Sequence, residues 1–219
     1  MNTIKNLCKK EWHLSLKNAI FIYVYALLGV LLLAPNYPYC TAFMYCVIGI
    51  AVLFGNYKGN KDLEFTAILP VKRTDIVKSK FIAILFIELV QIVIAIPFAL
   101  LSAFIVNTNG NLVGLDANFT LFAFAFIEYS VFNIIFLPLF FKTGYKVGKP
   151  AFWAILAYVV TTLALEFIVA FVPSLNAIFD GYSHLGYQAI LLVAGIVLFV
   201  LSTYLAFKMS VKNFEKVNL

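Results

Sequence analysis

Residues 57–80 read YKGNKDLEFTAILPVKRTDIVKSK, and residues 81–106, which follow directly, read FIAILFIELVQIVIAIPFALLSAFIV. The first stretch carries six of the sixteen Lys and Arg residues of the chain, whereas the second carries none. The second stretch is long and apolar enough to cross about 30 Å of hydrocarbon as a helix. The junction near residue 80 therefore predicts a charged segment at one membrane surface that continues into a membrane span.

The same alternation extends over the whole chain. All Lys and Arg residues fall in four segments, at 1–18, 57–80, 142–149 and 208–219. The intervening connectors at 35–38, 107–118 and 173–186 contain no Lys or Arg. Cytoplasmic loops of membrane proteins carry an excess of these residues. The pattern predicts six spans and places both termini in the cytosol, in what we expect to be a bacterial plasma membrane.

The composition agrees with a chain that lies mostly in lipid. Of its 219 residues, 63% are hydrophobic and 12% charged, and the mean hydropathy is +0.98. A soluble domain of this size cannot hide so much apolar surface. We expect an all-α integral membrane protein with a single transmembrane domain over 1–219. The net charge of +6 is spread along one membrane face, which suits anionic lipid and not nucleic acid.

The hydrophobic pattern sets the expected element boundaries. We expect spans at about 18–34, 39–57, 81–106, 119–141, 150–171 and 187–207. Residues 1–17 have helical apolar spacing among lysines, which predicts an amphipathic helix in the interface with Trp12 as its headgroup anchor. Segment 173–186 is unusually apolar for an outer loop and is expected to be either a short helix or a surface loop. The aromatic residues are expected first at lipid-facing and interface positions.

The segment at 61–80 is the most specific part of the sequence. Pro70 ends any helix before it, because the preceding residue is pushed toward extended backbone. Thr74 is expected to cap a new helix, with Asp75 favourable near its N-terminus. Two short, charged, amphipathic pieces around a rigid corner are typical of a docking element for another protein.

This segment resembles the cytosolic loop of the small six-span permease subunits of type-2 ABC transporters. The resemblance rests on Leu69-Pro70-Val71-Lys72-Arg73, followed by Ile76, Val77 and Lys80, between the second and third spans. It implies a permease dimer, formed with an identical chain or a close paralogue, in which each permease grips an ATP-binding subunit through a coupling helix. The residues that would dock the ATPase are Glu64, Leu69, Pro70, Val71, Lys72, Arg73, Asp75 and Ile76. Within the family the chain is most similar to exporters of amphipathic peptides, such as phenol-soluble modulins, or to bacteriocin-immunity exporters.

The chain itself is not expected to be an enzyme. A phosphate-binding loop needs spaced glycines followed by Lys and Ser or Thr. The run from Gly144 to Lys149 is one residue short of that pattern and ends in Pro150. The resemblance accordingly places ATP and Mg²⁺ on two separate ATPase subunits, with no cofactor bound by this chain.

The polar residues inside the expected spans include three glutamates and two amides that are candidates for function: Glu88, Gln91, Glu128, Asn133 and Glu166. Ionisable groups at membrane depth are costly and usually face protein or water. They are expected either to line the translocation path or to hydrogen-bond neighbouring helices. Gln91 is one turn from Glu88, and Asn133 and Tyr129 lie near Glu128 in sequence.

Two other functional classes compete with an ABC permease. An ion-coupled carrier or channel would use Glu88, Glu128 and Glu166 as proton or cation sites. An intramembrane metalloprotease would need paired Glu and His at membrane depth, but His13 and His184 are isolated near opposite surfaces. No metal site is therefore expected.

Overall fold

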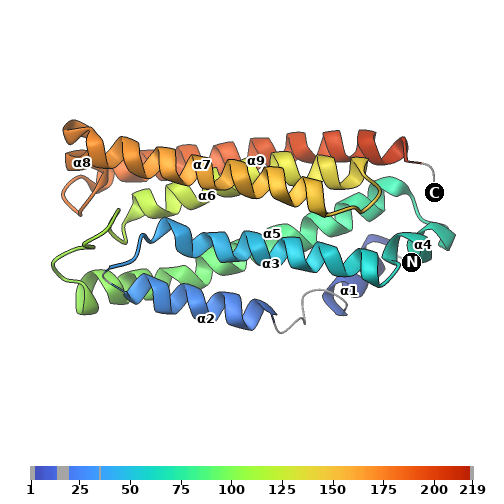
Figure 1. The fold of residues 1–219 in the computed structure, drawn as a ribbon, viewed down its shortest axis with the longest axis horizontal. Coiled ribbons are helices and arrows are strands. Elements are labelled where there is room, and N and C mark those ends of the chain that lie inside the picture. Colours follow the sequence, from blue (N-terminus) through green and yellow to red (C-terminus); the bar gives the residue numbers. More distant parts are fainter. Residues whose placement is uncertain (1–2, 14–19, 35, 218–219) are drawn as a thin grey trace.

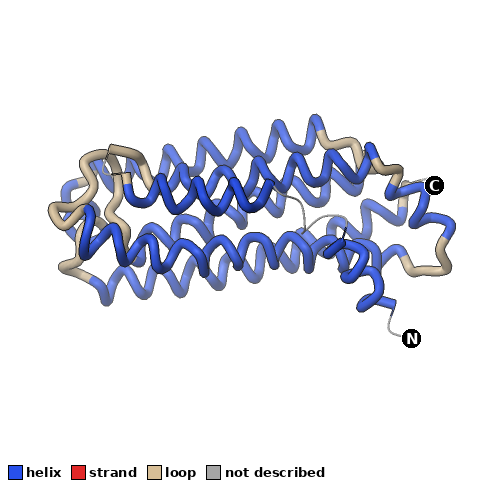
Figure 2. Tube along the Cα trace, turned by 90° about the horizontal axis from the view of Figure 1, so that it is seen from below, coloured by secondary structure: helices blue, strands red, loops and turns tan. Residues whose placement is uncertain are grey.

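The computed structural model describes residues 3–13, 20–34 and 36–217 as an elongated bundle of helices (Figure 1). The side chains of Leu63, Glu64 and Ala67 lie outside the described part. The described residues contain helices and loops and no strand, as Figure 2 shows. The expectation of an all-α membrane protein is confirmed.

The helices follow one another along the chain with short connections. In order they are α1 (Thr3–Glu11), α2 (Ile20–Leu33), α3 (Cys40–Gly59), α4 (Asp62–Ile68), α5 (Arg73–Leu101), a π-helical turn (Ser102–Val106), α6 (Phe119–Lys142), α7 (Gly148–Phe171), α8 (Pro173–Phe179) and α9 (Leu185–Glu215). Five of them, α3, α5, α6, α7 and α9, are long and apolar enough to cross a membrane. Helix α2 is apolar but shorter, with 14 residues, and part of the expected span 18–34 lies outside the described residues.

Two long helices extend further than the apolar pattern predicts. Helix α5 begins at Arg73, eight residues before the expected span 81–106, so the last part of the docking segment and this span share one helix. Helix α9 likewise continues to Glu215, past the expected end at 207. Each helix therefore carries a polar turn or two beyond its expected membrane-spanning part.

Helix α6 forms the centre of the bundle. Of the residues in its apolar middle, 72% are buried, against 22% in both α7 and α9. Helix α9 packs closely along it: a Cβ atom at Gly195 would lie 2.8 Å from the carbonyl oxygen of Ala123. Small residues allow such close backbone approach between membrane helices.

The placement of many aromatic side chains differs from the sequence expectation. Phe54, Phe136, Phe140, Phe141 and Tyr145 are almost fully buried and pack ring against ring at one end of the bundle. The closest centroids, those of Phe140 with Phe54 and with Tyr145, are 4.7 Å apart. In lipid, where water cannot drive helices together, such close aromatic packing supplies contact energy between helices.

The opposite end of the bundle is closed by polar loop contacts. The Asn118 side chain caps α6 by accepting hydrogen bonds from the backbone N–H groups of Thr120 and Leu121. Its amide also donates to the carbonyls of Phe179, at 3.0 Å, and Gly181, at 2.8 Å. The connector 107–118 is thereby tied to the turn that follows α8.

Candidate functional site

The segment between α3 and α5 forms a helix, a corner and a second helix. Helix α4 follows Lys61, whose backbone is left-handed (φ 51°), and ends at Leu69, which is extended as expected before Pro70. The expected cap at Thr74 is wrong, because α5 already starts at Arg73 after an extended Lys72. Asp75 lies in the first turn of α5, where its charge complements the helix dipole.

Helix α4 lies at the extreme end of the bundle, near both described chain ends (Figure 1). It exposes two large apolar side chains, Phe65 at 57% and Ile68 at 84%. A recess of about 390 Å³ separates this corner from α1 and is lined by Leu7, Phe65 and Pro70 among others. Two exposed apolar side chains beside this recess make the corner a candidate interaction surface.

The structure divides the predicted docking residues into two groups. Pro70 and Lys72 are exposed, and Leu69, Val71 and Asp75 are partly exposed, so they are available to a partner. Ile76 is 3% exposed and therefore unavailable to a partner, which corrects its prediction as a contact. The Glu64 side chain lies outside the described part. Phe65 and Ile68 were missed, because their exposure depends on how α4 is tilted.

Arg73 has a different role from the one its charge suggested. Its guanidinium donates hydrogen bonds to the carbonyl oxygens of Phe214, Glu215 and Val217 at 2.8–2.9 Å. The last carbonyls of a helix have no partner within it, and a cation there also complements the dipole. Arg73 therefore fastens the end of α9 to the start of α5.

A buried cluster of four charged side chains holds α4 in place. Lys80 Nζ lies 2.8 Å from Asp62 Oδ2 and 3.3 Å from Glu11 Oε1. Lys10 Nζ lies 2.7 Å from Asp62 Oδ1 and 3.4 Å from Glu11 Oε1. The side chains of Glu11, Asp62 and Lys80 are at most 2% exposed. Two positive and two negative groups from α1, α4 and α5 thus balance each other away from water.

Aromatic groups complete this charge cluster. The Tyr57 hydroxyl donates to Glu11, and the Tyr57 ring lies 3.3 Å from Lys80 Nζ. The Tyr145 ring lies 5.2 Å from the same ammonium, within the range of cation–π attraction. Burial alone would raise the pKa of the Asp62 carboxyl, but attraction to Lys80 and Lys10 outweighs it and lowers that pKa below its ordinary value.

The charge cluster was not found from the sequence, although its lysines lie in the predicted segments. The neighbours Lys10 and Glu11 are far in the chain from Asp62 and from Lys80, and only the packing of α1, α4 and α5 brings the three places together. Together, the four charges hold neighbouring helices in a fixed arrangement. Breaking one member of a buried ion network leaves an uncompensated charge, so α1, α4 and the start of α5 are held as one unit.

The polar residues within the spans pair with one another inside the chain. Asn133 donates to Glu88 at 3.0 Å, joining α6 to α5. The Tyr129 hydroxyl donates to Gln91 at 2.6 Å, again between α6 and α5. All four side chains are fully buried.

A third bridge joins α6 to α7 and involves a residue that the sequence did not suggest. The Tyr158 hydroxyl donates to Glu128 at 2.6 Å, so the sequence neighbours Asn133 and Tyr129 are not its partners. Glu166 is half-buried toward the connector 107–118, with Oε1 close to Gly114. One carboxyl oxygen of Glu88 and one of Glu128 have no hydrogen-bond partner among the described residues.

Trp12 lies just beyond α1 and is 45% exposed. Its ring packs edge-on against Phe86 of α5, with centroids 5.7 Å apart. The side chain therefore has both an apolar contact and an exposed face, as an interfacial tryptophan needs.

The apolar spans and the charged segment at one end together define a multi-pass membrane protein with a surface for a partner. The family to which the chain belongs is the ABC-2 family of transporter proteins, whose model matches residues 6–215. No curated protein and no solved structure gave a match. The chain is thus the membrane subunit of an ABC transporter, a permease component that works with an ATP-binding subunit and lipid.

Proposed function

We propose that the chain is the permease subunit of an ATP-driven exporter and that segment 61–80 is its coupling element. The observation that carries this proposal is the exposed apolar end of α4, held on the spans by the buried charge cluster. A partner that grips Phe65, Ile68 and Pro70 would move α4 together with α1 and α5, because the buried charge cluster joins the three helices.

ATP chemistry belongs to the partner in this proposal. The ATP-binding subunit holds ATP and Mg²⁺, and its closure on ATP binding and reopening after hydrolysis displace the docked corner. Because α4 is connected to the spans through Asp62 and Lys80, the displacement tilts α5 at its cytosolic end. Both termini and the docking segment lie on the Lys- and Arg-rich face, which the positive-inside rule assigns to the cytosol.

The exporter contains two permeases and two ATPases in this proposal. Glu88, Gln91, Glu128 and Asn133 each take part in a buried bridge within one chain. A route for a large substrate then lies between two permeases, and closed two-fold symmetry is the usual arrangement. The sequence resemblance favours amphipathic peptides or other apolar molecules as the substrate.

The test is reconstitution with a candidate ABC ATP-binding subunit, sought first among the genes that neighbour this one. The two chains should copurify, and the complex should release an amphipathic peptide from the inner leaflet only when ATP is hydrolysed. Native mass spectrometry should show two copies of each chain. A permease that purifies alone and never binds that ATPase would reject the proposal.

An ion-coupled carrier is the second candidate, favoured by the unpaired carboxyl oxygens of Glu88 and Glu128. A carrier should move substrate down an imposed proton gradient without any ATPase. Transport by the permease alone in vesicles separates the two mechanisms.

A further inference from the structure

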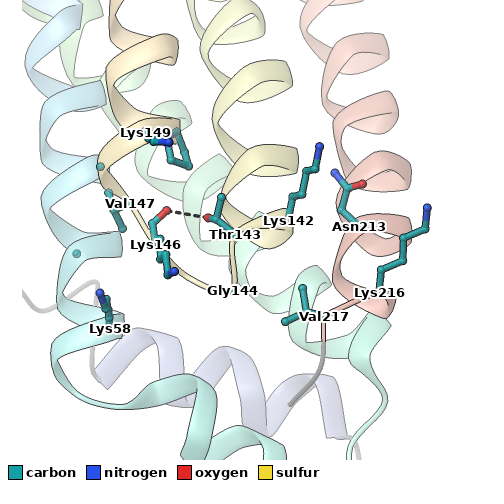
Figure 3. A pocket seen from close by; sticks show the side chains of 13 residues that line it. Lys58, Lys142, Thr143, Gly144, Lys146, Val147, Lys149, Asn213, Lys216 and Val217 are labelled. Carbon is teal, nitrogen blue, oxygen red and sulfur yellow. Dashed lines mark hydrogen bonds between the residues drawn. The ribbon is translucent and has the colours of Figure 1, made fainter.

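A broad recess opens among the basic ends of the spans, as Figure 3 shows. Its volume is about 1220 Å³, and it is bordered by the end of α3, the turn between α6 and α7, and the end of α9. Five lysines line it, and none of its lining residues is acidic: Lys58, Lys142, Lys146, Lys149 and Lys216. Such a concentration of positive charge around a hollow attracts an anion.

These lysines differ from three basic residues that are engaged within the chain. Lys10 and Lys80 are neutralised in the buried charge cluster, and Arg73 is bound to the end of α9. In the described part of the chain, no ion pair involves any of the five lysines around the recess. The positive-inside rule accounts for lysines on this face, but it does not require them to surround a recess.

The backbone of the α6–α7 turn favours the same kind of ligand. Gly144 (φ 60°) and Tyr145 (φ 66°) are left-handed, and the Thr143 hydroxyl donates to the Lys146 carbonyl at 2.9 Å (Figure 3). After this turn, α7 begins at Gly148. A Cβ atom at Gly148 would meet no other atom within 4 Å, so the space beside this helix end is open. First-turn N–H groups lack helical partners and form the positive end of the dipole.

Neighbouring side chains indicate the depth of this recess. Phe152 and Trp153 follow in the next turn of α7 and are 62% and 55% exposed. Exposed Trp at the end of a span marks headgroup level. The recess thus lies where phosphate groups of lipids are found, with apolar helix surface beside it for acyl chains.

We propose that this recess is a binding site for the phosphate of an anionic phospholipid in the inner leaflet. Basic pockets between the cytosolic ends of membrane helices are suited to such headgroups. The lysine ammonium groups would neutralise the phosphate, and the start of α7 would offer it backbone donors. A bound lipid would join α3, the α6–α7 turn and α9, which otherwise meet around a hollow.

The test measures lipid retention by the full-length permease with native mass spectrometry. Protein purified in detergent is titrated with phosphatidylglycerol, cardiolipin or zwitterionic phosphatidylcholine. We expect saturable retention of the anionic lipids and little of phosphatidylcholine. The triple variant Lys58→Gln, Lys146→Gln, Lys149→Gln should weaken this retention roughly 100-fold, from the contribution of each interfacial lysine.

The matched control removes three exposed lysines from the same face but outside the recess, Lys72→Gln, Lys208→Gln and Lys212→Gln. It should retain lipid as the parent protein does, and both triples should melt near the parent temperature. Equal retention by all three proteins would overturn the proposal. So would displacement of the lipid by millimolar inorganic phosphate, which would indicate a site for free phosphate. If the triple variant in the recess retains lipid normally but no longer assembles with the ATPase, the lysines would instead be assigned to protein docking.

Discussion

Lys80 Nζ lies 2.8 Å from Asp62 Oδ2, and neither side chain is more than 2% exposed. This pair connects the proposed docking helix α4 to the helix that enters the membrane as the third span. This ion pair joins the two helices directly. The same Lys80 Nζ also lies 3.3 Å from Glu11 Oε1 of α1. The energetics of this contact lead to the first two predictions.

Replacing Lys80 by Met should strongly destabilise the cytosolic end of the protein. The substitution leaves Glu11 and Asp62 buried with only Lys10 to balance them, which costs about 3–5 kcal/mol. Melting of the purified permease should fall by several degrees. Lys78→Met, at an exposed position two residues away, is the control and should melt like the parent. Equal melting of both variants would contradict a structural role for the cluster.

Acid should weaken the same region. The folded pKa of Asp62 lies below its ordinary value of 3.8, so its stabilising contribution is fully present above that value. It is lost as the pH falls through the lower, folded pKa. Melting temperature measured from pH 6 down to pH 2.5 should therefore drop, and Asp62→Asn should have a lower but flatter profile. Parallel profiles for the two proteins would mean that Asp62 does not contribute to the acid dependence.

Ile68→Asp should abolish assembly with the ATPase without harming the permease. Ile68 is 84% exposed, so the fold loses little, whereas a buried charge at a docking interface typically costs several kcal/mol. Copurification of the ATPase should fall at least about tenfold. The matched control is Leu112→Asp, which is 73% exposed on the connector 107–118. Undiminished assembly in the Ile68 variant would place the docking surface elsewhere.

Substitutions at Glu128 distinguish a helix bridge from a substrate-binding charge. Glu128→Gln can still accept the hydrogen bond from Tyr158, so stability and export should change little. Glu128→Leu leaves the Tyr158 hydroxyl buried without a partner, which costs about 1–3 kcal/mol. Melting curves and transport assays on both variants provide the measurement. Lost export in the Gln variant, with assembly and ATP hydrolysis intact, would show that the charge itself acts on the substrate.

Single cysteines test the orientation of the bundle. In a background without Cys8, Cys40 and Cys46, cysteines at Asn36, Leu112 and Ser183 should react with an impermeant reagent added to intact cells. Cysteines at Lys61, Lys146 and Lys212 should react only after the cells are opened. All six positions are exposed. If the cysteine at position 61 were labelled from outside, the topology would be the inverse of the predicted one. The docking surface would then lie on the side of the membrane away from the ATPase.

The Lys and Arg distribution and the apolar runs already predicted the class of protein. Membrane insertion depends on local properties, namely span length, hydrophobicity and flanking charge, and these can be read along one chain. The Leu69–Arg73 corner was also predictable, because Pro70 restricts its neighbour locally. Helix ends were predicted less well: Thr74 was expected as a cap, but α5 begins at Arg73.

Tertiary packing decided which polar residues meet. Glu88 pairs with Asn133, and Glu128 pairs with Tyr158 of a helix thirty residues further along. Nothing in the spacing of these residues specifies those partners, since they depend on how α5, α6 and α7 are rotated. The same holds for the four charges around Lys80, for the exposure of Ile68 and for the lysine-lined recess. The sequence by itself determined that these groups lie at a given depth or on a given face, because those are properties of single helices. Their partners are properties of helix pairs and exist only once the bundle has formed.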